Sequence, residues 1–398
     1  MADATALDVV AEPNRAILDE VIDTRRHLHR NPEIGFQETA TTQLIRRRLQ
    51  ELGLRLEECP TETGAVATLE GGRPGKAVML RADIDALPIQ EESGVDFEST
   101  HDGVMHACGH DGHTAMMLGA ARMLAQHAET LPGRYLFVFQ PAEEIVEGAK
   151  AMIAGGLFES HRPDFAVGLH LSPFYETGSV IARPGLQWGG SDAFELLMRG
   201  PGGHGGLIRR QGNVVAAQGF FLERMHTVVE GLEADGSECH INVGDIRTDG
   251  LWNVVPRRVW LSGSLRTFDK ELRGEALDRF RALLLETETE FSVRCELELV
   301  HGTVPMINHP TAWEAVMAAG REVVGDRAVA LERPLTVSDD MAEFMVHVPG
   351  CYFNLGARPP DLEVPPSLHQ STMRIDEDAL AVGVKVLGRA AVKLAEQR

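Results

Sequence analysis

Short apolar segments alternate with amphipathic segments along the first part of this chain. The apolar segments have the length of strands, and we expect strands at 76–88, 134–140 and 165–171. The amphipathic segments predict helices at 14–30, 37–53, 114–128 and 147–155. Short apolar strands separated by helices indicate a largely parallel α/β sheet that is covered on both faces.

The order of the predicted elements changes after a Gly- and Pro-containing linker at 183–192. A strand, a helix, two strands, a helix and a strand follow, at 192–199, 213–232, 238–247, 257–268, 271–290 and 292–300. This β-α-β-β-α-β order is the ferredoxin-like, split βαβ pattern. Helical and strand signals then return at 311–325, 340–347, 350–355 and 376–396.

A chain of 398 residues is long enough for two domains. We therefore predict an α/β fold with a mostly parallel-sheet catalytic domain at 1–185 and 300–398, and an inserted ferredoxin-like α+β domain at 186–299. The strands of the insert alternate apolar and polar residues, which leaves one face for solvent or for helices.

Composition excludes several classes of partner. Acidic residues outnumber basic ones by 59 to 38, and the formal charge of −21 argues against nucleic acid or an anionic membrane. We find no apolar run of about 18 residues and no secretory signal at the N-terminus. Five cysteines at scattered spacings do not resemble a disulfide framework, so the cytoplasm is the expected compartment.

The segment HACGHDGH at 106–113 is the densest group of metal-binding residue types. Cys108 and His110 are one residue apart, so in an extended segment both side chains point the same way. A helix follows, and either Asp111 or Thr114 could be its N-cap. The alternative is a buried structural cysteine with incidental histidines, which is as common when the segment is considered alone.

The predicted strand at 134–140 ends in PAEE, where Pro141 stops the ladder and presents Glu143 and Glu144 side by side. Adjacent carboxylates repel each other unless a cation or a proton separates them. One glutamate on a metal and its neighbour on a water molecule would resolve this repulsion. A solvated acidic helix start is an equally good explanation of the pair alone.

Further candidates lie in other strand-end loops. His170 is close to the end of an apolar strand, and His369 lies in a proline-rich loop before the last helix. Asp83 and Asp85 end another strand and are candidates for support of metal ligands. Singly, each has an ordinary explanation as a core or surface residue. Together, loops that all present ligand types are much less probable by chance.

Nine segments in order resemble the dinuclear-metal aminoacylase and carboxypeptidase-type peptidase family, in the branch of hippurate hydrolases and indole-acetyl-amino-acid hydrolases. They are RRHLHRNPEIGFQET (25–39), LRADIDALP (80–88), HACGHDGHTAMMLGAA (106–121), FQPAEE (139–144), HLSP (170–173), GGH (202–204), NVVP (253–256), SDDMAEF (338–344) and LHQ (368–370). The similarity extends over nearly the whole chain, and the HACGHD and FQPAEE motifs are highly specific as an ordered pair.

The resemblance implies two divalent metal ions bound by five residues: Cys108, His110, Glu144, His170 and His369. Cys108 would bridge the ions. Glu143 would be the general base, and His204 would polarise the scissile carbonyl, either in its own chain or from the partner subunit of a homodimer. A mixed set of thiolate, imidazole and carboxylate suits manganese or zinc, with cobalt a third candidate.

The remaining roles follow from the same resemblance. Asn253 and Arg266 match substrate-facing positions in the inserted domain, which would act as a lid and dimerisation domain. Four residues would support the ligands: Asp83, Asp85, Asp111 and His113. We assign no role to His106.

Three segments depart from the family pattern, at 205–214, 248–252 and 145–148. They place Ile208, Arg209 and Trp252 near substrate-facing loops. Arg209 and Arg210 could recognise a carboxylate, although a solvated basic pair is the more common situation. Trp252 could stack on an aromatic acyl group or could pack within the protein. The metal motifs are intact, so the departures bear on the substrate.

We therefore expect a metal-dependent amidohydrolase acting on an N-acyl (acetyl, benzoyl or indole-acyl) amino acid or a similar small aryl amide. A dipeptidase, or another C–N hydrolase such as an aryl-amine aminohydrolase, is the first alternative. A cysteine-nucleophile enzyme using Cys108 with His110 or His113 is the second. A non-catalytic metal-binding protein is the third.

Overall fold

A computed structural model describes residues 13–207 and 209–397. They form two compact units. The first comprises the described parts of Met1–Gly185, Ile307–Glu332 and Asp339–Arg398, and the second comprises Leu186–Met306 and Arg333–Ser338. The second unit thus extends beyond the expected 186–299. The expectation about a secretory signal falls mainly on residues 1–12, which lie outside the described residues, as does Ile208.

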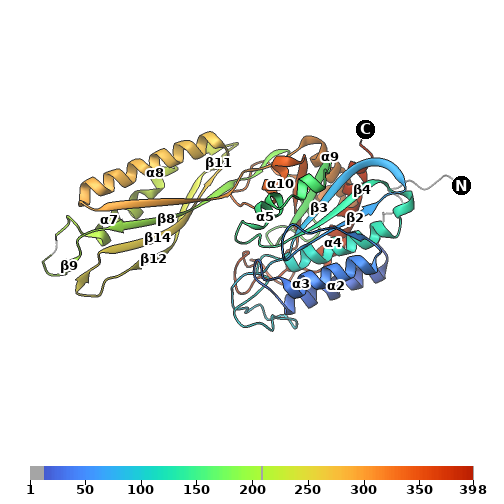
Figure 1. Ribbon diagram of the computed structural model, residues 1–398, viewed down its shortest axis with the longest axis horizontal. Helices are drawn as coiled ribbons and strands as arrows, with labels where there is room; N and C mark the ends of the chain where they lie inside the picture. Colours follow the sequence, from blue (N-terminus) through green and yellow to red (C-terminus); the bar gives the residue numbers. More distant parts are fainter. Residues whose placement is uncertain (1–12, 208, 398) are drawn as a thin grey trace. The chain divides into compact units, whose positions relative to one another are not determined.

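An eight-stranded sheet forms the centre of the first unit (Figure 1). Its strands follow the order β1 (Arg55–Leu56), β2 (Ala65–Glu70), β4 (Pro132–Gln140), β3 (Arg73–Asp83), β5 (Phe165–Ser172), β18 (Gly350–Gly356), β6 (Val180–Ala182) and β17 (Ala328–Ala330). β4, β3, β5 and β18 pair in parallel. The outer pairs β1–β2, β2–β4 and β18–β6 are antiparallel. The prediction of a mostly parallel α/β sheet is confirmed.

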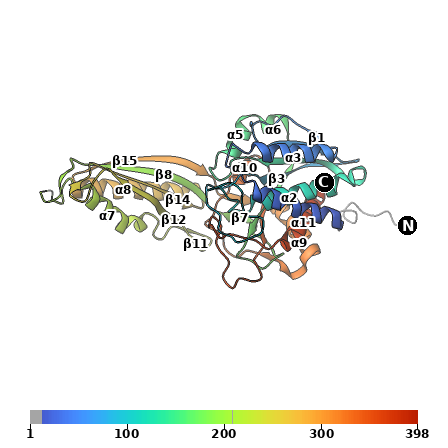
Figure 2. The same ribbon diagram turned by 90° about the horizontal axis from the view of Figure 1, so that it is seen from below.

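Helices cover both faces of this sheet (Figures 1 and 2). One layer contains α2 (Arg15–Arg30), α4 (His110–Ala125), α9 (Pro310–Val324) and α11 (Asp378–Ala395). It packs on strand residues such as Leu80 and Ala82, which belong to the main hydrophobic core. The neighbours of these residues along β3, Arg81 and Asp83, point to the other face, because side chains alternate along a strand.

Two short helices lie on that second face: α5 (Gly148–Ala154) and α10 (Met341–His347). Asp340, the residue before α10, accepts hydrogen bonds from Arg81 at 2.8 Å and from the backbone N–H of Ala149 in α5 at 3.0 Å. Polar contacts therefore join these helices to the sheet. None of the described helices is both long and apolar enough to cross a lipid bilayer.

Helix α4 begins at His110, four residues earlier than the expected 114. Its N-cap is Gly109 with φ of 89°, and no side chain caps it. The expectation that Asp111 or Thr114 is the N-cap was therefore wrong. Both side chains have other partners: the Asp111 carboxylate accepts from Arg25, and the Thr114 hydroxyl donates to the carbonyl of Asp83. A left-handed turn at this position requires glycine or a strained residue.

The second unit has the ferredoxin-like order, as predicted. Its elements are β8 (Gly190–Arg199), α7 (Val214–Arg224), β12 (His240–Thr248), β14 (Arg258–Thr267), α8 (Lys270–Phe291) and β15 (Arg294–Thr303). The sheet order is β12-β14-β8-β15, and all three pairs are antiparallel. The predicted helix at 213–232 is shorter than expected, because a 3₁₀ turn at Met225–Val228 follows α7.

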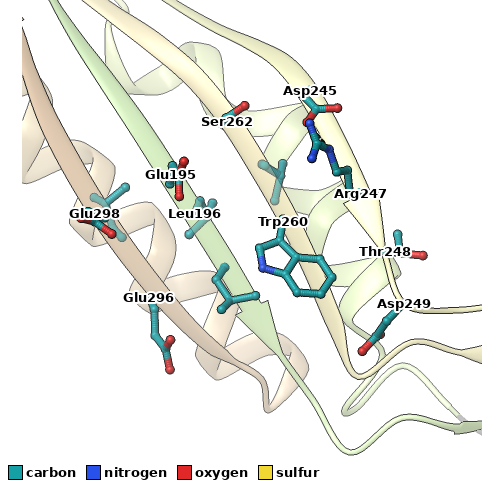
Figure 3. Close-up of a pocket in the computed structure, with 13 residues that line it drawn as sticks. Glu195, Leu196, Asp245, Arg247, Thr248, Asp249, Trp260, Ser262, Glu296 and Glu298 are labelled. Carbon is teal, nitrogen blue, oxygen red and sulfur yellow. Dashed lines mark ion pairs between the residues drawn. The ribbon is translucent and has the colours of Figure 1, made fainter.

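Helices α7 and α8 cover one face of the four-stranded sheet and enclose a core with Phe194, Phe221 and Phe280. The other face carries a shallow pocket of about 890 Å³ (Figure 3). Trp260 lies in it, with the guanidinium of Arg258 4.8 Å from the ring centroid. The alternation of apolar and polar residues in these strands reflects this one-sided burial.

Candidate metal centre

The residues expected to bind metal lie at the carboxyl ends of the parallel strands and in the adjoining loops. His170 is near the end of β5, Glu143 and Glu144 follow β4, and Cys108 and His110 are at the entrance of α4. His369 comes from the loop before α11, and its backbone N–H donates to the carbonyl of Ala107 at 2.9 Å. Ligand sites of open α/β sheets form at this edge.

The five predicted donor atoms form one cluster centred on Cys108. The Sγ atom of Cys108 is 3.4 Å from Nε2 of His170 and 3.3 Å from Nε2 of His369. Oε2 of Glu144 is 3.3 Å from Nε2 of His369, and Oε1 is 3.7 Å from Nε2 of His110. Cys108 belongs to two donor groups, one with His110 and His170 and the other with Glu144 and His369.

These separations fit donors arranged around cations. Donors about 2.0–2.3 Å from a tetrahedral ion lie roughly 3.3–3.8 Å apart. Two buried atoms of the cluster, Nε2 of His110 and Oε1 of Glu144, have no hydrogen-bond partner in the described part of the chain. Buried polar atoms normally have a partner, so a cation is the simplest complement to both.

Backbone carbonyls fix the orientation of two imidazoles. Nδ1 of His110 donates to the carbonyl of Asp85 at 2.9 Å, and Nδ1 of His170 donates to the carbonyl of Leu171 at 2.6 Å. In each ring the carbonyl oxygen therefore requires a proton on Nδ1, which leaves Nε2 as the nitrogen that faces the cluster. This arrangement is typical of metal-ligating histidines. Burial lowers the pKa of His170 to about 3, which keeps this ring neutral and able to bind a metal.

Asp83 and Asp85 form hydrogen bonds with residues of the segments that carry the predicted ligands. Oδ2 of Asp85 accepts from the backbone N–H of Glu144 at 2.9 Å. Oδ1 of Asp83 accepts from Nδ1 of His113 at 2.6 Å. Nε2 of His113 in turn accepts from the backbone N–H of Leu171 at 2.8 Å, so both ring nitrogens of His113 are engaged within the protein.

Asp111 lies on the helix layer, away from the cluster, and joins α4 to α2. Its Oδ2 accepts from Nε of Arg25 and from Nδ1 of His29, both at 2.8 Å. Nε2 of His29 continues the network to Glu91 at 2.8 Å. The N-terminal motif that contains Arg25 and His29 therefore supports the helix that carries His110. His106 is buried close by, with a ring centroid 6.5 Å from that of His29.

Negative charge is concentrated around Glu143. This side chain is buried, and it forms a group with the carboxylates of Asp339 and Asp340. Burial and the charge of Asp339 raise the pKa of Glu143 well above its ordinary value. Burial likewise raises the pKa of Glu144 to about 7. Burial and Glu144 raise the pKa of the Cys108 thiol. All three shifts oppose the anionic forms, and bound cations would reverse them.

The charged network beneath Glu143 is one that sequence reasoning missed. Arg81 is fully buried and pairs with Asp83 at 2.9 Å, Asp339 at 3.1 Å and Asp340 at 2.8 Å. Its Nε also donates to Oε1 of Gln140, the last residue of β4, at 2.7 Å. The available signal was an arginine within the apolar run of β3, since a buried arginine requires acidic partners.

Comparisons with known proteins identify the family of this chain. The profile of the peptidase family M20/M25/M40 matches residues 79–393. The N-acetyl-L-cysteine deacetylase of Bacillus subtilis (strain 168) is 32% identical over 377 residues, covering 94% of this chain and 88% of the deacetylase. Thermostable carboxypeptidase 2 of Saccharolobus solfataricus is 31% identical over 392 residues, covering 96% of this chain and 97% of the carboxypeptidase.

The chain belongs to peptidase family M20/M25/M40. The solved structure of the Bacillus subtilis YxeP protein, described as a dinuclear metal binding peptidase from the M20 family, superposes with a TM-score of 0.80. The two chains are 28% identical, and the match covers 96% of this chain and 99% of YxeP. The expected family is thereby confirmed, and the protein is an M20 hydrolase that acts on amide bonds.

Three predicted residues lie in the second unit of this M20 protein. His204, in β9 (Gly203–His204), pairs with Val254 of β13 (Val254–Val255). The adjacent Gly205 donates to the carbonyl of Asn253 at 2.9 Å, so His204 and Asn253 are neighbours. Arg266 is at the other end of the unit, since it pairs with Ser191 at the start of β8, and its guanidinium donates to Ser338.

The departures from the M20 pattern have clear structural consequences. Trp252 is 96% exposed within its own chain, so the alternative that it packs in the protein was wrong. Arg210 pairs with Glu290 at 2.8 Å and lies over the ring of Phe291, 4.7 Å from its centroid. The Arg210 side chain is nevertheless 56% exposed and Arg209 is exposed as well, so the expectation of a solvated basic pair is confirmed. In the segment 145–148, Val146 adopts a left-handed φ of 57°.

Proposed function

We propose that this M20 hydrolase cleaves the amide bond of an N-acyl amino acid of the acetyl, benzoyl or indole-acyl type, or of a similar small aryl amide. The observation that carries the proposal is the sharing of Cys108 by two groups of donor atoms, with the carboxylate of Glu143 beside them. Oε2 of Glu143 is 3.8 Å from Nε2 of His110. Relatives named as deacetylases of N-acetyl amino acids support this substrate class.

Five residues would hold two divalent ions: Cys108, His110, Glu144, His170 and His369. Such ions would polarise the amide carbonyl and acidify a water molecule. Manganese and zinc are the candidates, with cobalt third, because thiolate favours zinc and the resembled branch favours manganese. Cys108 would bridge, since it is the member common to both donor groups.

Glu143 would act as the general base. It would accept a proton from the attacking water at a carboxylate oxygen and deliver it to the nitrogen of the leaving amine. Its burial excludes competing solvent, and the neighbouring Glu144 is held by Asp85. Asp83, Asp111 and His113 would keep the ligands oriented.

The second unit would serve as a lid and dimerisation domain. His204 would donate a hydrogen bond to the oxyanion, and Asn253 and Arg266 would contact the substrate. A homodimer would allow His204 to act on the partner's centre. Mixing inactive His204→Ala and Glu143→Gln proteins tests this, because mixed dimers regain one complete site only if His204 acts in trans.

The carboxypeptidase relatives favour a second candidate, a carboxypeptidase or dipeptidase. Another C–N hydrolase activity, such as that of an aryl-amine aminohydrolase, would use the same centre. A cysteine nucleophile is less well supported, because burial raises the pKa of Cys108 whereas reactive cysteines have lowered values. A non-catalytic metal protein would have no need for Glu143 beside the donors.

A substrate panel on metal-analysed protein tests the proposal. The panel contains N-acetyl, N-benzoyl and indole-acyl amino acids together with free dipeptides. Chelator should abolish activity, and manganese or zinc should restore it. Glu143→Gln should retain both ions and lose about 10²–10⁴-fold in kcat. Glu147→Gln is the matched control, since Glu147 follows in the same loop but its side chain is 51% exposed. A Glu143→Gln enzyme with normal kcat would refute the assigned base.

A further inference from the structure

The turn after β4 that carries Glu143 and Glu144 contains a strained residue. Ala142 has a φ of 53°, in the left-handed region that is unfavourable for residues with a Cβ atom. Such a conformation persists only where surrounding structure holds it. The backbone of Ala142 directly precedes Glu143, so whatever holds this turn also sets the position of the proposed base.

Glu38 holds the turn from one side. Its Oε1 accepts from the backbone N–H of Ala142 at 2.9 Å, and its Oε2 accepts from the hydroxyl of Thr63 at 2.7 Å. The side chain is fully buried, and burial raises the pKa of this carboxyl. A buried acid satisfied by neutral donors is costly to desolvate. The stability of the fold therefore does not explain why a carboxylate is buried at Glu38.

Gly35 packs against the same turn. A Cβ atom on Gly35 would lie 3.0 Å from Cα and 3.1 Å from Cβ of Ala142. Gly35 and Glu38 both belong to the motif at 25–39, whose later part has no role in binding metal. The turn is held in its left-handed conformation by two contacts. The backbone of Gly35 packs closely against Ala142, and Glu38 accepts a hydrogen bond from the N–H of Ala142.

The loop has a separate second anchor at Glu144. Oδ2 of Asp85 accepts from the backbone N–H of Glu144 at 2.9 Å. Glu38 thus acts before Glu143, and Asp85 acts after it. Loss of the first anchor should disturb the base more than the metal ligand, because the ligand keeps its own hydrogen bond.

We propose that Glu38 is a positioning residue that holds the Ala142 turn and thereby places the carboxylate of Glu143 for proton transfer. The inference rests on the proposed role of Glu143. Its mechanism is geometric: a shift of about 1 Å in a reacting group costs about 10²-fold in rate.

The test compares Glu38→Ala with Glu38→Gln and with Glu33→Ala in the metal-loaded enzyme. The glutamine keeps an oxygen that can accept from Ala142. Glu33 is a matched control, since it lies in the same motif and accepts from the backbone N–H groups of Ala40 and Thr41 at the start of α3 (Thr39–Glu51). Measurements are kcat, KM and bound metal per chain.

We expect Glu38→Ala to lower kcat about 100-fold, with KM and metal content within about twofold of wild type. Glu38→Gln should retain kcat within about threefold, and Glu33→Ala should be unchanged. Gly35→Ala provides an independent perturbation of the turn, to be used also if Glu38→Ala does not fold, and should lower kcat as well.

Unchanged kcat in metal-loaded Glu38→Ala or in Gly35→Ala would overturn the inference. Equal losses in Glu38→Ala and Glu33→Ala, or in Glu38→Ala and Glu38→Gln, would also overturn it. The proposed function is judged separately by Glu143→Gln. If Glu143→Gln is inactive while the Glu38 variants are normal, only the positioning role fails.

Discussion

Replacing Arg81 by methionine should strongly destabilise the first unit. The side chain is completely buried, and methionine retains most of its apolar length while removing the charge. Three carboxylates, Asp83, Asp339 and Asp340, lie within 2.8–3.1 Å of its guanidinium nitrogens. Without Arg81 these acids must either remain ionised in a buried place or take up protons.

The magnitude follows from the burial of both partners. Removing one partner of a buried ion pair costs about 3–5 kcal/mol, because the other charge is left uncompensated. We expect the free energy of unfolding to fall by about this amount. The variant should also become more sensitive to alkaline conditions than wild type. Its carboxyl pKa values rise in the folded state, so folding binds extra protons, and stability falls with rising pH by about 1.4 kcal/mol per unit for each proton.

Denaturant unfolding of chelator-treated protein at pH 6 and pH 8 measures the effect without a contribution from bound metal. Arg55→Met is the matched control, because Arg55 is 66% exposed and pairs with Glu57 at the surface. We expect this control to lose at most about 1 kcal/mol. Asp340→Asn should partly rescue Arg81→Met, because it removes one of the unpaired charges.

Two results would refute the reasoning on Arg81. One is an Arg81→Met protein whose free energy of unfolding is within about 1 kcal/mol of wild type. The other is an Asp340→Asn substitution that destabilises the variant as much as it destabilises the wild type. Either result would mean that the carboxylates are already neutral or solvated in the folded state.

Three further predictions concern other parts of the chain. Cys108→Ala should reduce bound metal from two ions per chain to one or fewer by elemental analysis, because the shared donor is lost; full occupancy would contradict the bridging role. Glu377→Gln should lower the free energy of unfolding at pH 7 by about 1–2 kcal/mol. Glu377 pairs with Arg26 and Arg25 and has a lowered pKa, so its stabilisation is present above the ordinary carboxyl pKa and disappears in acid; a difference from wild type that persists at pH 3 would be inconsistent with this origin. Trp252→Ala should change the free energy of unfolding by less than about 0.5 kcal/mol, because the side chain is 96% exposed; a larger loss in a thermal scan would show that it packs.

Long helices and strands were predictable because the periodic pattern of apolar residues repeats several times within each of them. The helix expected at 14–30 is α2 (Arg15–Arg30), and the strand expected at 165–171 is β5 (Phe165–Ser172). Very short strands such as β6 (Val180–Ala182) contain too few residues to show a period and were not predicted. The start of α4 was misplaced because a glycine in the left-handed region, and no side-chain cap, begins it.

The proposed metal donors were predicted from residue type and from their place after strands, and the structure brings them into one cluster. Their supporting groups were not, because the partners are far apart in the chain. Arg81 pairs with Asp340 across a separation of 259 residues, and Glu38 holds Ala142 across 104. No local pattern encodes such pairs. Asp339 and Asp340 belong to the SDDMAEF motif, but the motif alone does not show their role. That role becomes clear only in the structure, where both carboxylates pair with Arg81 of β3.

The buried charges of the first unit also show how loops can be held rigidly. A buried ion pair generally adds little stability compared with apolar residues of the same size, and the apolar core already supplies the packing. The five proposed donors come from segments as far apart as Cys108 and His369, which are separated by 261 residues in sequence. Beyond the ends of the strands no sheet ladder fixes the backbone, yet a metal centre requires placement within about 0.5 Å. Side chains such as Glu38 and Asp85 replace the missing ladder with hydrogen bonds to individual backbone groups. Precision at the site, and not added stability, is therefore the physical reason that we propose for these buried acids.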